Sequence, residues 1–401
     1  MVEVLQDFIL QWTPSALVEW IHQRLDYLMV NIIPTEYSVA AFLLLSLTLS
    51  FAVAKSLKFL SSRSARLDAE SRRSNAFPVS CPIVTPHGNG IVQSYNVKRD
   101  AYSVDIQGVV AEIPASDITT PRVHDLLVYP IKSCGGVHVD NAQILKRGLA
   151  CDRQWLVIDA KNEAVTLKTH PKMALIHPIV DFDKPDVLTL TAQGMAPLVV
   201  PVVKSGGVER TVRCFKDIVQ SIDQGDAAAT WIATFLDEPA FRLVRFKDSY
   251  HRECDPNVAP GHETAFANEL PILLSAAASL ESIQTELKRP ITIERFRPNI
   301  VVSGCPAWAD DTWRDFEIGG LRFRNVKPCP RCIKPSIDPA TGIKDDETLS
   351  NIQEVLKAQR NGQRLGFLGK SAHQKFFGTY VVCDTMGSVS VGDPVKVLTV
   401  F

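Results

Sequence analysis

The stretch that decides the fold is "KPCPRCIKPSIDPATG", residues 327–342. It places Cys329 and Cys332 on either side of Pro330 and Arg331. A cysteine pair at this spacing is typical of half a zinc site, of a redox dithiol, or of a loop that presents a thiolate to a softer metal. The surrounding sequence bears on each of these alternatives.

A closed zinc site needs further ligands, and here only the distant Cys305 and His373 are available to complete a tetrahedron. A redox dithiol usually lies at the start of a helix, where the helix dipole lowers a thiol pKa. Prolines at 328, 330 and 335 oppose a regular helix through this motif. Two half-buried loop cysteines, or a thiolate for a soft metal with Arg331 beside it to hold an anion, remain as alternatives.

The composition is that of a globular protein with no strong charge bias. The chain has 401 residues, 46% of them apolar, and a formal net charge of -1. This leaves room for two or three domains and disfavours non-specific nucleic-acid binding. The nine cysteines form no compact disulfide framework, which favours a reducing compartment. They are Cys81, Cys134, Cys151, Cys214, Cys254, Cys305, Cys329, Cys332 and Cys383.

Residues 38–54 read "SVAAFLLLSLTLSFAVA" and carry no charge. We expect a single transmembrane helix here; a buried core helix or a cleaved signal peptide are the alternatives. An excess of cations follows this segment, so the positive-inside rule predicts that the C-terminal part faces the cytosol. These cations are Lys55, Lys58, Arg63, Arg66, Arg72 and Arg73.

Short apolar and alternating runs with turns between them dominate the rest of the chain, which predicts a mostly β, barrel-like α+β fold. Helices are expected at "DAAATWIATFLD" (226–237), "AAASLESIQTELK" (276–288) and "LSNIQEVLKAQRN" (349–361). We predict six segments. They are an N-terminal segment (1–36), a transmembrane anchor (37–56), a juxtamembrane linker (57–78), a small SH3-like β module (79–121), a β-barrel subdomain (122–250) and a C-terminal domain (251–401).

Five motifs carry a resemblance to a known family. They are "VYPIKSC" (128–134), "CDRQWLVID" (151–159), "RFRPNIVVSG" (295–304), "FEIGGLRFRNVKPCPRCIKPSIDPATG" (316–342) and "GSVSVGDPVKVL" (387–398). In this order they resemble MOSC-type molybdenum-cofactor proteins, and within that group the mitochondrial amidoxime reducing components. The resemblance covers about residues 122–401.

The resemblance implies a set of site residues. The second cysteine of the family's CxRC motif ligates molybdenum, and Cys332 occupies that position. One thiolate suits a metal that already has two sulfur ligands from a molybdopterin dithiolene. The positions that match cofactor-binding residues of the family are Lys132, Ser133, Arg153, Arg297, Asn299, Pro330 and Arg331.

One position departs from the family pattern. The family often carries an aspartate close to the metal, whereas "FANELP" places Asn268 there. We take Asn268, with Cys332, as a catalytic candidate, although an amide cannot act as a carboxylate base. The source of the proton in the reaction is therefore open.

The resemblance implies a membrane-anchored enzyme that reduces N-hydroxylated compounds such as amidoximes and hydroxylamines. No flavin, haem or nicotinamide motif is visible in the sequence, so electrons would come from partners, in the family a b-type cytochrome and its NADH-dependent reductase. The expected location is the outer mitochondrial membrane or the endoplasmic reticulum. Alternatives are a non-catalytic cofactor carrier and a sulfurase-like MOSC protein, whose pyridoxal-phosphate domain the first 121 residues are too short to hold.

Overall fold

The computed structural model describes Lys55, Lys58, residues 61–345 and residues 350–401. The chain divides into two compact units, Met1–Ser74 and Asn75–Phe401. The predicted transmembrane segment lies outside the described residues. Within the described part of the chain, no helix is long and apolar enough to cross a bilayer.

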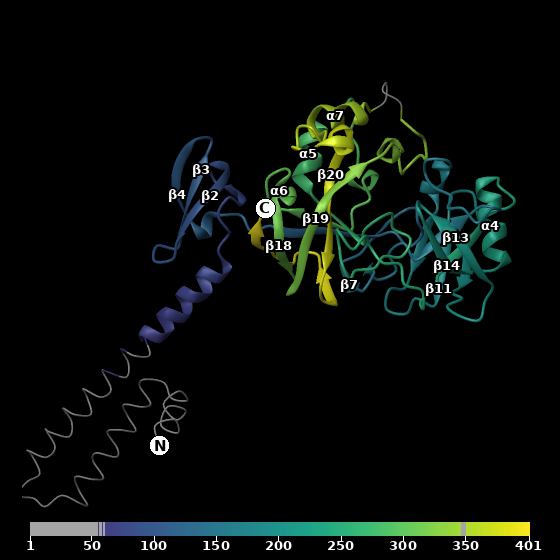
Figure 1. Ribbon diagram of the computed structural model, residues 1–401, viewed down its shortest axis with the longest axis horizontal. Helices are drawn as coiled ribbons and strands as arrows, with labels where there is room; N and C mark the ends of the chain where they lie inside the picture. The colour runs from purple at the N-terminus through teal and green to yellow at the C-terminus, as the bar shows by residue number, and fades with distance from the viewer. Residues whose placement is uncertain (1–54, 56–57, 59–60, 346–349) are drawn as a thin grey trace, which may run out of the picture. The chain divides into compact units, whose positions relative to one another are not determined.

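The described end of the first unit is helical. Residues 61–74 form a continuous stretch of helix whose side chains are almost all exposed (Figure 1). This stretch contains no Gly or Pro, and Arg66 Nε donates to Glu70 Oε1 at 3.0 Å across one helical turn. Much of the predicted linker is thus regular helix, because a polar composition does not prevent helix formation where breakers are absent.

The second unit begins with a small antiparallel sheet. Its strands β1 (Pro82–Thr85), β2 (Gly88–Asn96), β3 (Ala101–Ile106) and β4 (Val109–Pro114) pair in sequence order. Gln107 and Gly108 both have positive φ and form the two-residue turn between β3 and β4, a conformation that glycine adopts readily.

The middle of the chain forms two further sheets and a helix. One sheet contains β10 (His177–Val180), β11 (Val187–Thr191) and β12 (Leu198–Pro201). The other has the order β13 (Glu209–Cys214), β14 (Asp217–Asp223), β15 (Arg242–Phe246) and β9 (Trp155–Ile158). The helix α4 (Asp226–Leu236) connects β14 and β15 and buries one apolar face.

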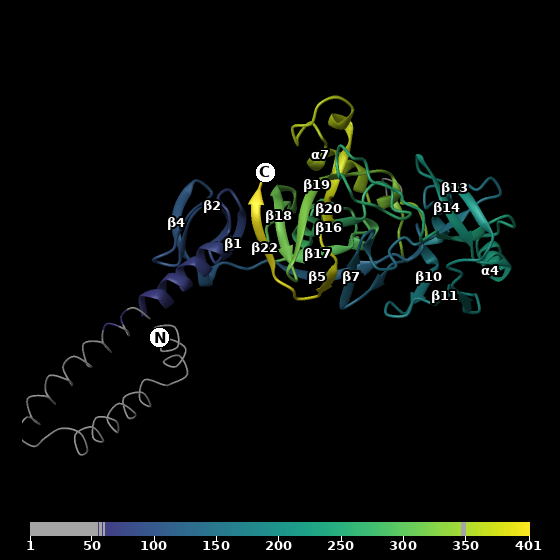
Figure 2. The ribbon, with the colours of Figure 1, turned by 60° about the horizontal axis from the view of Figure 1, so that its bottom comes forward.

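An eight-stranded sheet forms the largest layer of the molecule. Figure 2 shows most of its strands side by side. Their order is β22 (Val395–Val400), β18 (Trp313–Ile318), β19 (Leu321–Arg331), β20 (Lys375–Cys383), β16 (Ile272–Ala276), β17 (Ile300–Ser303), β5 (Arg122–Val128) and β6 (Val137–His138). A last sheet contains β21 (Gly387–Ser390), β7 (Asn141–Leu145) and β8 (Gly148–Leu149).

The strands of the predicted barrel subdomain and of the C-terminal domain interleave. Strand β5 pairs with β17, and β7 pairs with β21 near the C-terminus. Only β16 and β17 in the large sheet run parallel; the other strand pairs of the described residues are antiparallel. This pairing brings the start of β16, the start of β17 and the end of β5 to the same edge of the sheet.

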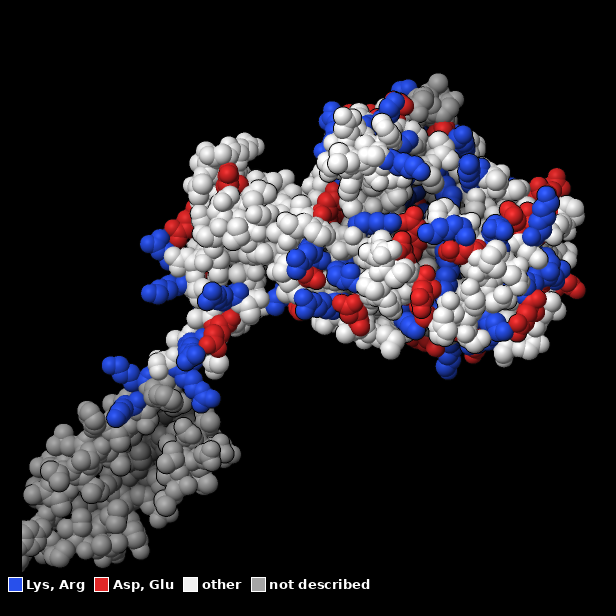
Figure 3. All heavy atoms as spheres, viewed as in Figure 1, with Lys and Arg blue, Asp and Glu red and all other residues white. Residues whose placement is uncertain are grey.

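The expected mostly β composition and the three expected helices are confirmed. The described part of the chain is mostly β, with α5 (Ala277–Gln284) and α7 (Ile352–Arg360) at the expected places beside α4. The short α6 (Ala309–Thr312) was not expected from the sequence. Charges of both signs are interspersed over the face of Asn75–Phe401 in Figure 3. Short 3-10 helices are η1 (Ala115–Asp117), η2 (Pro171–Leu175), η3 (Ile293–Arg295), η4 (Lys334–Ser336) and η5 (Gly369–His373).

Candidate cofactor site

A solvent-open cleft of about 770 Å³ brings together all the residues predicted for the site. Its lining includes, from different loops and strands, Lys132, Ser133, Arg153, Asn268, Arg297, Asn299, Pro330, Arg331 and Cys332. Asn268 precedes β16, Arg297 and Asn299 precede β17, and Lys132 follows β5, so the shared sheet edge explains their convergence.

The two cysteines of the opening motif occupy opposite environments. Cys329 is 2% exposed near the end of β19, whereas Cys332 is exposed just after that strand. Pairing of β19 with β20 is irregular between Pro328 and Pro330, because proline cannot donate a ladder hydrogen bond. The strand therefore buckles at Cys329 and presents Cys332 at the cleft.

In the part of the chain that the structure describes, no other protein group completes a conventional metal site at this position. Among the described residues, all nine cysteines are free, and no three His, Cys, Asp or Glu side chains gather closely enough to hold a metal ion. The thiol of Cys332 is the soft ligand atom that the cleft exposes.

A buried polar network forms the wall of the cleft at β17. Asn299 is 1% exposed; its Nδ2 donates to Leu127 O at 3.1 Å and to Asp152 Oδ1 at 3.0 Å. Its Oδ1 accepts from Leu273 N at 3.2 Å and from Arg153 Nη1 at 2.9 Å. All four hydrogen-bonding positions of this amide are therefore used within the protein.

Two arginines of this wall stack on one tyrosine. The guanidinium carbons of Arg153 and Arg297 lie 4.5 and 4.1 Å from the centre of the Tyr129 ring. Arg153 also donates to Arg297 O at 3.0 Å and pairs with Asp152, and Arg297 donates to Cys134 O at 2.6 Å. Burial and the neighbouring Arg153 lower the pKa of Arg297 to about 10.

Three cleft residues adopt left-handed backbone conformations. The φ angles of Ser133, Arg153 and Arg297 are 72°, 47° and 57°. Residues other than glycine are rarely found there, and such conformations concentrate at ligand sites, where surrounding contacts enforce them. Here the hydrogen bonds of Arg153 and Arg297 hold these two residues in that conformation.

A second wall, which we call the Cys332 wall, is formed by Arg331 and its neighbours. Its Nη2 donates to Phe296 O at 2.6 Å, and its Nη1 lies 3.1 Å from Cys329 Sγ. Tyr380 of β20 also lines this wall, and burial together with Cys329 raises its pKa. Cys329 thus positions Arg331 beside Cys332.

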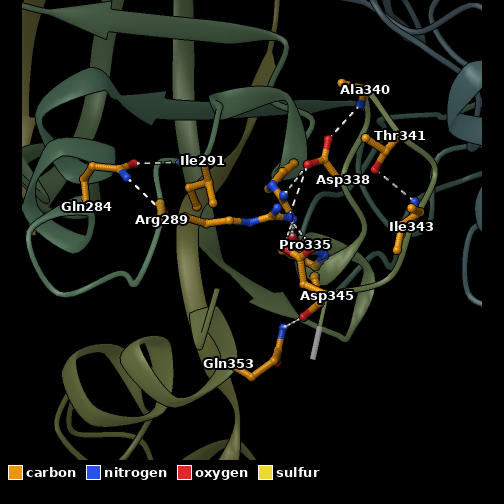
Figure 4. A network of polar contacts seen from close by, with 12 residues as sticks. Gln284, Arg289, Ile291, Pro335, Asp338, Ala340, Thr341, Ile343, Asp345 and Gln353 are labelled. Carbon is orange, nitrogen blue, oxygen red and sulfur yellow. Dashed lines mark hydrogen bonds and ion pairs between the residues drawn. The ribbon is translucent and has the colours of Figure 1, made fainter. Parts of the chain in front are cut away.

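The loop after Cys332 is fixed by a second polar network (Figure 4). Buried Arg295 pairs with Asp338 and Asp345 at 3.0 and 2.8 Å, and Arg289 contacts the same two carboxylates. The "DPATG" turn closes through Gly342 N, which donates to Asp338 O at 2.8 Å. Ion pairs with residues outside the cysteine motif therefore hold the loop that carries Cys332.

The lining of the cleft is strongly cationic. Six cations line it, and none of its described lining residues is Asp or Glu. This local charge contrasts with the net charge of -1 for the whole chain. The six are Lys132, Arg153, Arg295, Arg297, Arg331 and Lys334.

Comparison with known proteins identifies the family. The MOSC N-terminal beta barrel domain matches residues 120–239, and the MOSC domain matches residues 261–396. The chain is 35% identical to mitochondrial amidoxime reducing component 2 of Bos taurus over 284 residues, which are 68% of this chain and 82% of that protein. It is 33% identical to mitochondrial amidoxime-reducing component 1 of Homo sapiens over 286 residues, or 69% and 82% of the two chains. The chain belongs to the MOSC family.

In this MOSC protein, the cleft fits an anionic cofactor with a phosphate and a heterocycle. Arg297 Nη2 and Arg331 Nε are buried cleft atoms with no hydrogen-bond partner among the described residues. Unsatisfied guanidinium atoms are costly in a protein interior and suit an anionic or polar ligand. They are the observation that favours cofactor binding by these residues.

Several residues of this MOSC site were not predicted from the sequence. Lys334 and Tyr380 line the cleft, and Tyr129 and Asp152 hold its arginines. Asp152 and Lys334 lie within the quoted motifs, so a count of the charged residues in these motifs would have pointed to both. Tyr380 gave no such signal, because only the pairing of β20 with β19 brings it to Cys329.

Proposed function

We propose that the chain is a molybdenum-cofactor oxidoreductase that reduces N-hydroxylated compounds. The observation that carries this proposal is a cationic cleft without carboxylates, in which one exposed thiol, Cys332, stands beside unsatisfied arginine atoms. The names of the relatives, amidoxime reducing components, support the choice of substrate.

In this proposal each wall of the cleft has a separate task. Cys332 supplies the single protein thiolate to the metal, and Pro330 shapes the loop beside it. Arg153, Ser133 and Arg297 bind and orient the pterin and its phosphate from the β17 wall, with Lys132 and Arg331 adding positive charge. Asn299, which we expected to bind the cofactor, acts through Arg153, because its amide is fully hydrogen-bonded within the protein. When bound, the molybdenum cofactor would supply the two-electron chemistry that removes oxygen from nitrogen.

The partners rest on the family resemblance of the sequence motifs, and the location rests on the names of the relatives. Electrons would come one at a time from a b-type cytochrome and its NADH-dependent reductase. The names of these relatives favour a mitochondrial location. If residues 37–56 anchor the chain in the outer mitochondrial membrane or the endoplasmic reticulum, a shared membrane surface would raise the effective concentration of these partners.

A non-catalytic cofactor carrier is the second candidate. It is favoured by Asn268, which places an amide where the family often has a carboxylate. A carrier and an enzyme would both bind cofactor, so only turnover separates them.

The test is metal analysis followed by an activity assay. Protein purified from a host that makes the cofactor should contain about one molybdenum per chain and should reduce an amidoxime with a reduced dye as electron donor. Bound molybdenum without turnover would favour the carrier. Stoichiometric zinc without molybdenum would contradict both candidates.

A further inference from the structure

Lys132 occupies an unusual place in the cleft. Its side chain is 7% exposed, and its Nζ donates to Phe266 O and to Asn268 Oδ1, each at 2.6 Å. Both acceptors are uncharged. Among the described residues, no carboxylate forms an ion pair with this ammonium group within 4.0 Å.

The segment that holds Lys132 is itself firmly bound. Arg252, 5% exposed, donates to Ala265 O at 2.6 Å, to Ala267 O at 2.5 Å and to Asn268 O at 2.9 Å. Its own charge is balanced by Asp217, at 2.6 Å. Asn268 therefore presents its amide oxygen to Lys132 from a fixed backbone.

The surroundings of Lys132 favour release of its proton. Burial, with smaller contributions from nearby cations, lowers the pKa of Lys132 to about 7. The charged and titratable groups that face it are Cys214 of β13, Lys334 of η4, Arg252 and Arg153; of these, only Cys214 acts in the opposite direction. A group with a pKa near the working pH is suited to general acid catalysis.

We propose that Lys132 is the proton donor of the reaction, with its ammonium group protonating the oxygen that leaves the substrate, and that Asn268 is the residue that positions it. This inference rests on the proposed function. An amide has no proton to give at neutral pH, so Asn268 cannot take this role itself. Lys132 donates to the side-chain oxygen of Asn268, whereas Arg252 contacts the backbone oxygen of that residue and is paired with Asp217.

The proposed step balances. Reduction of a hydroxylamine to an amine breaks the N–O bond, consumes two electrons and two protons, and releases one water. The external one-electron donor protein supplies both electrons in turn. One proton passes from Lys132 Nζ to the leaving oxygen, the nitrogen takes the other from solvent, and solvent then reprotonates the neutral amine of Lys132.

The test combines a direct titration with kinetics. The 13Cε signal of Lys132, assigned by its loss in Lys132→Arg, is followed against pH in cofactor-free and cofactor-loaded protein. In Asn268→Asp, a carboxylate replaces the neutral partner and should raise the pKa of Lys132. If Lys132 donates the proton, kcat should fall as pH rises through its pKa, and this fall should move upward in Asn268→Asp by the shift that the titration measures.

Two further variants complete the test. Lys132→Arg keeps the charge but holds its proton too tightly, so kcat should fall by about 10²–10⁴-fold while molybdenum content is retained. Lys146→Arg, an exposed lysine outside the cleft that pairs with Glu263, should leave kcat and its pH dependence unchanged.

The two failures are distinguishable. Loaded wild-type protein that reduces no N-hydroxylated substrate would overturn the proposed function and this inference with it. Wild-type protein that turns over, but whose pH profile stays fixed when the titration moves, would overturn only the role of Lys132. The same holds if Lys132→Arg keeps kcat within about threefold, far less than general acid catalysis contributes.

Discussion

The β17 wall and the Cys332 wall of the cleft differ in how many of their hydrogen-bonding groups already have partners within the protein. At the β17 wall, Asn299 uses every hydrogen-bonding position and Arg153 is bound by three partners and a ring, so that among the described lining residues of this wall Arg297 Nη2 is the atom left without a hydrogen-bond partner. At the Cys332 wall, the thiol is exposed and Arg331 Nε has no partner. Polar groups that already have partners hold the cleft in shape, whereas exposed groups and buried groups without a partner are free to bind a ligand. We therefore expect substitutions at the Cys332 wall to lower activity and substitutions at the β17 wall to lower stability.

The largest expected effect is a loss of activity without a loss of fold at the Cys332 wall. In Cys332→Ser, a hard hydroxyl replaces the soft thiolate, so activity should fall by more than about 100-fold, beyond what the loss of an outer-sphere contact causes. The exposed position predicts an unchanged melting temperature. Amidoxime turnover and a thermal melt measure the two quantities.

Cys329→Ser is the matched control. This cysteine is buried and contacts Arg331, so we expect a loss of activity within about 10-fold and a loss of stability of about 1 kcal/mol. If Cys329 were essential and Cys332 dispensable, the assignment of the metal ligand would be wrong.

The second prediction concerns the β17 wall. Asn299→Ala removes four hydrogen bonds and leaves partners such as Leu127 O buried, so the free energy of unfolding should fall by about 3 kcal/mol. Urea denaturation of cofactor-free protein measures this. A loss of activity with full stability would mean that Asn299 serves the ligand and not the scaffold, which would break the distinction between the walls.

How much of the site was predictable depends on where its contacts come from. Cys332, Arg331 and Lys132 lie in short motifs, so the sequence alone placed them in the site. The helix at 226–237 was found because its apolar residues share one face, and Trp231 and Ile232 are indeed buried there. The motif residues and this helix could therefore be predicted from short stretches of sequence.

The rest depends on contacts between distant segments. Tyr380 reaches the site through strand pairing, and Asn268 reaches Lys132 across more than a hundred residues of chain. The left-handed backbone of Ser133 is also invisible in sequence, because serine has no preference for that conformation. Such features follow from the whole fold and not from any short stretch of it.

The third prediction uses the pH dependence of stability. The pKa of Lys132 is about 7 in the folded protein and about 10.4 in an unfolded chain, so between these values the unfolded state binds more protons. Its contribution to the free energy of unfolding should therefore rise with pH from about 7 to about 10. Lys132→Met should remove this slope, measured by urea denaturation at several pH values. An identical slope in both proteins would mean that Lys132 stays protonated on folding.

The smallest effect tests whether backbone strain in the cleft serves the ligand. Ser133→Gly relieves a left-handed conformation, so the free energy of unfolding of cofactor-free protein should rise by about 0.5–1 kcal/mol. Ser133→Ala keeps the Cβ atom and the strain but removes the hydroxyl, and should not gain stability. If both variants lose cofactor equally, the hydroxyl binds it. If only the glycine variant does, the fixed backbone of Ser133 contributes to binding, and the β17 wall is preorganised by strain as well as by hydrogen bonds.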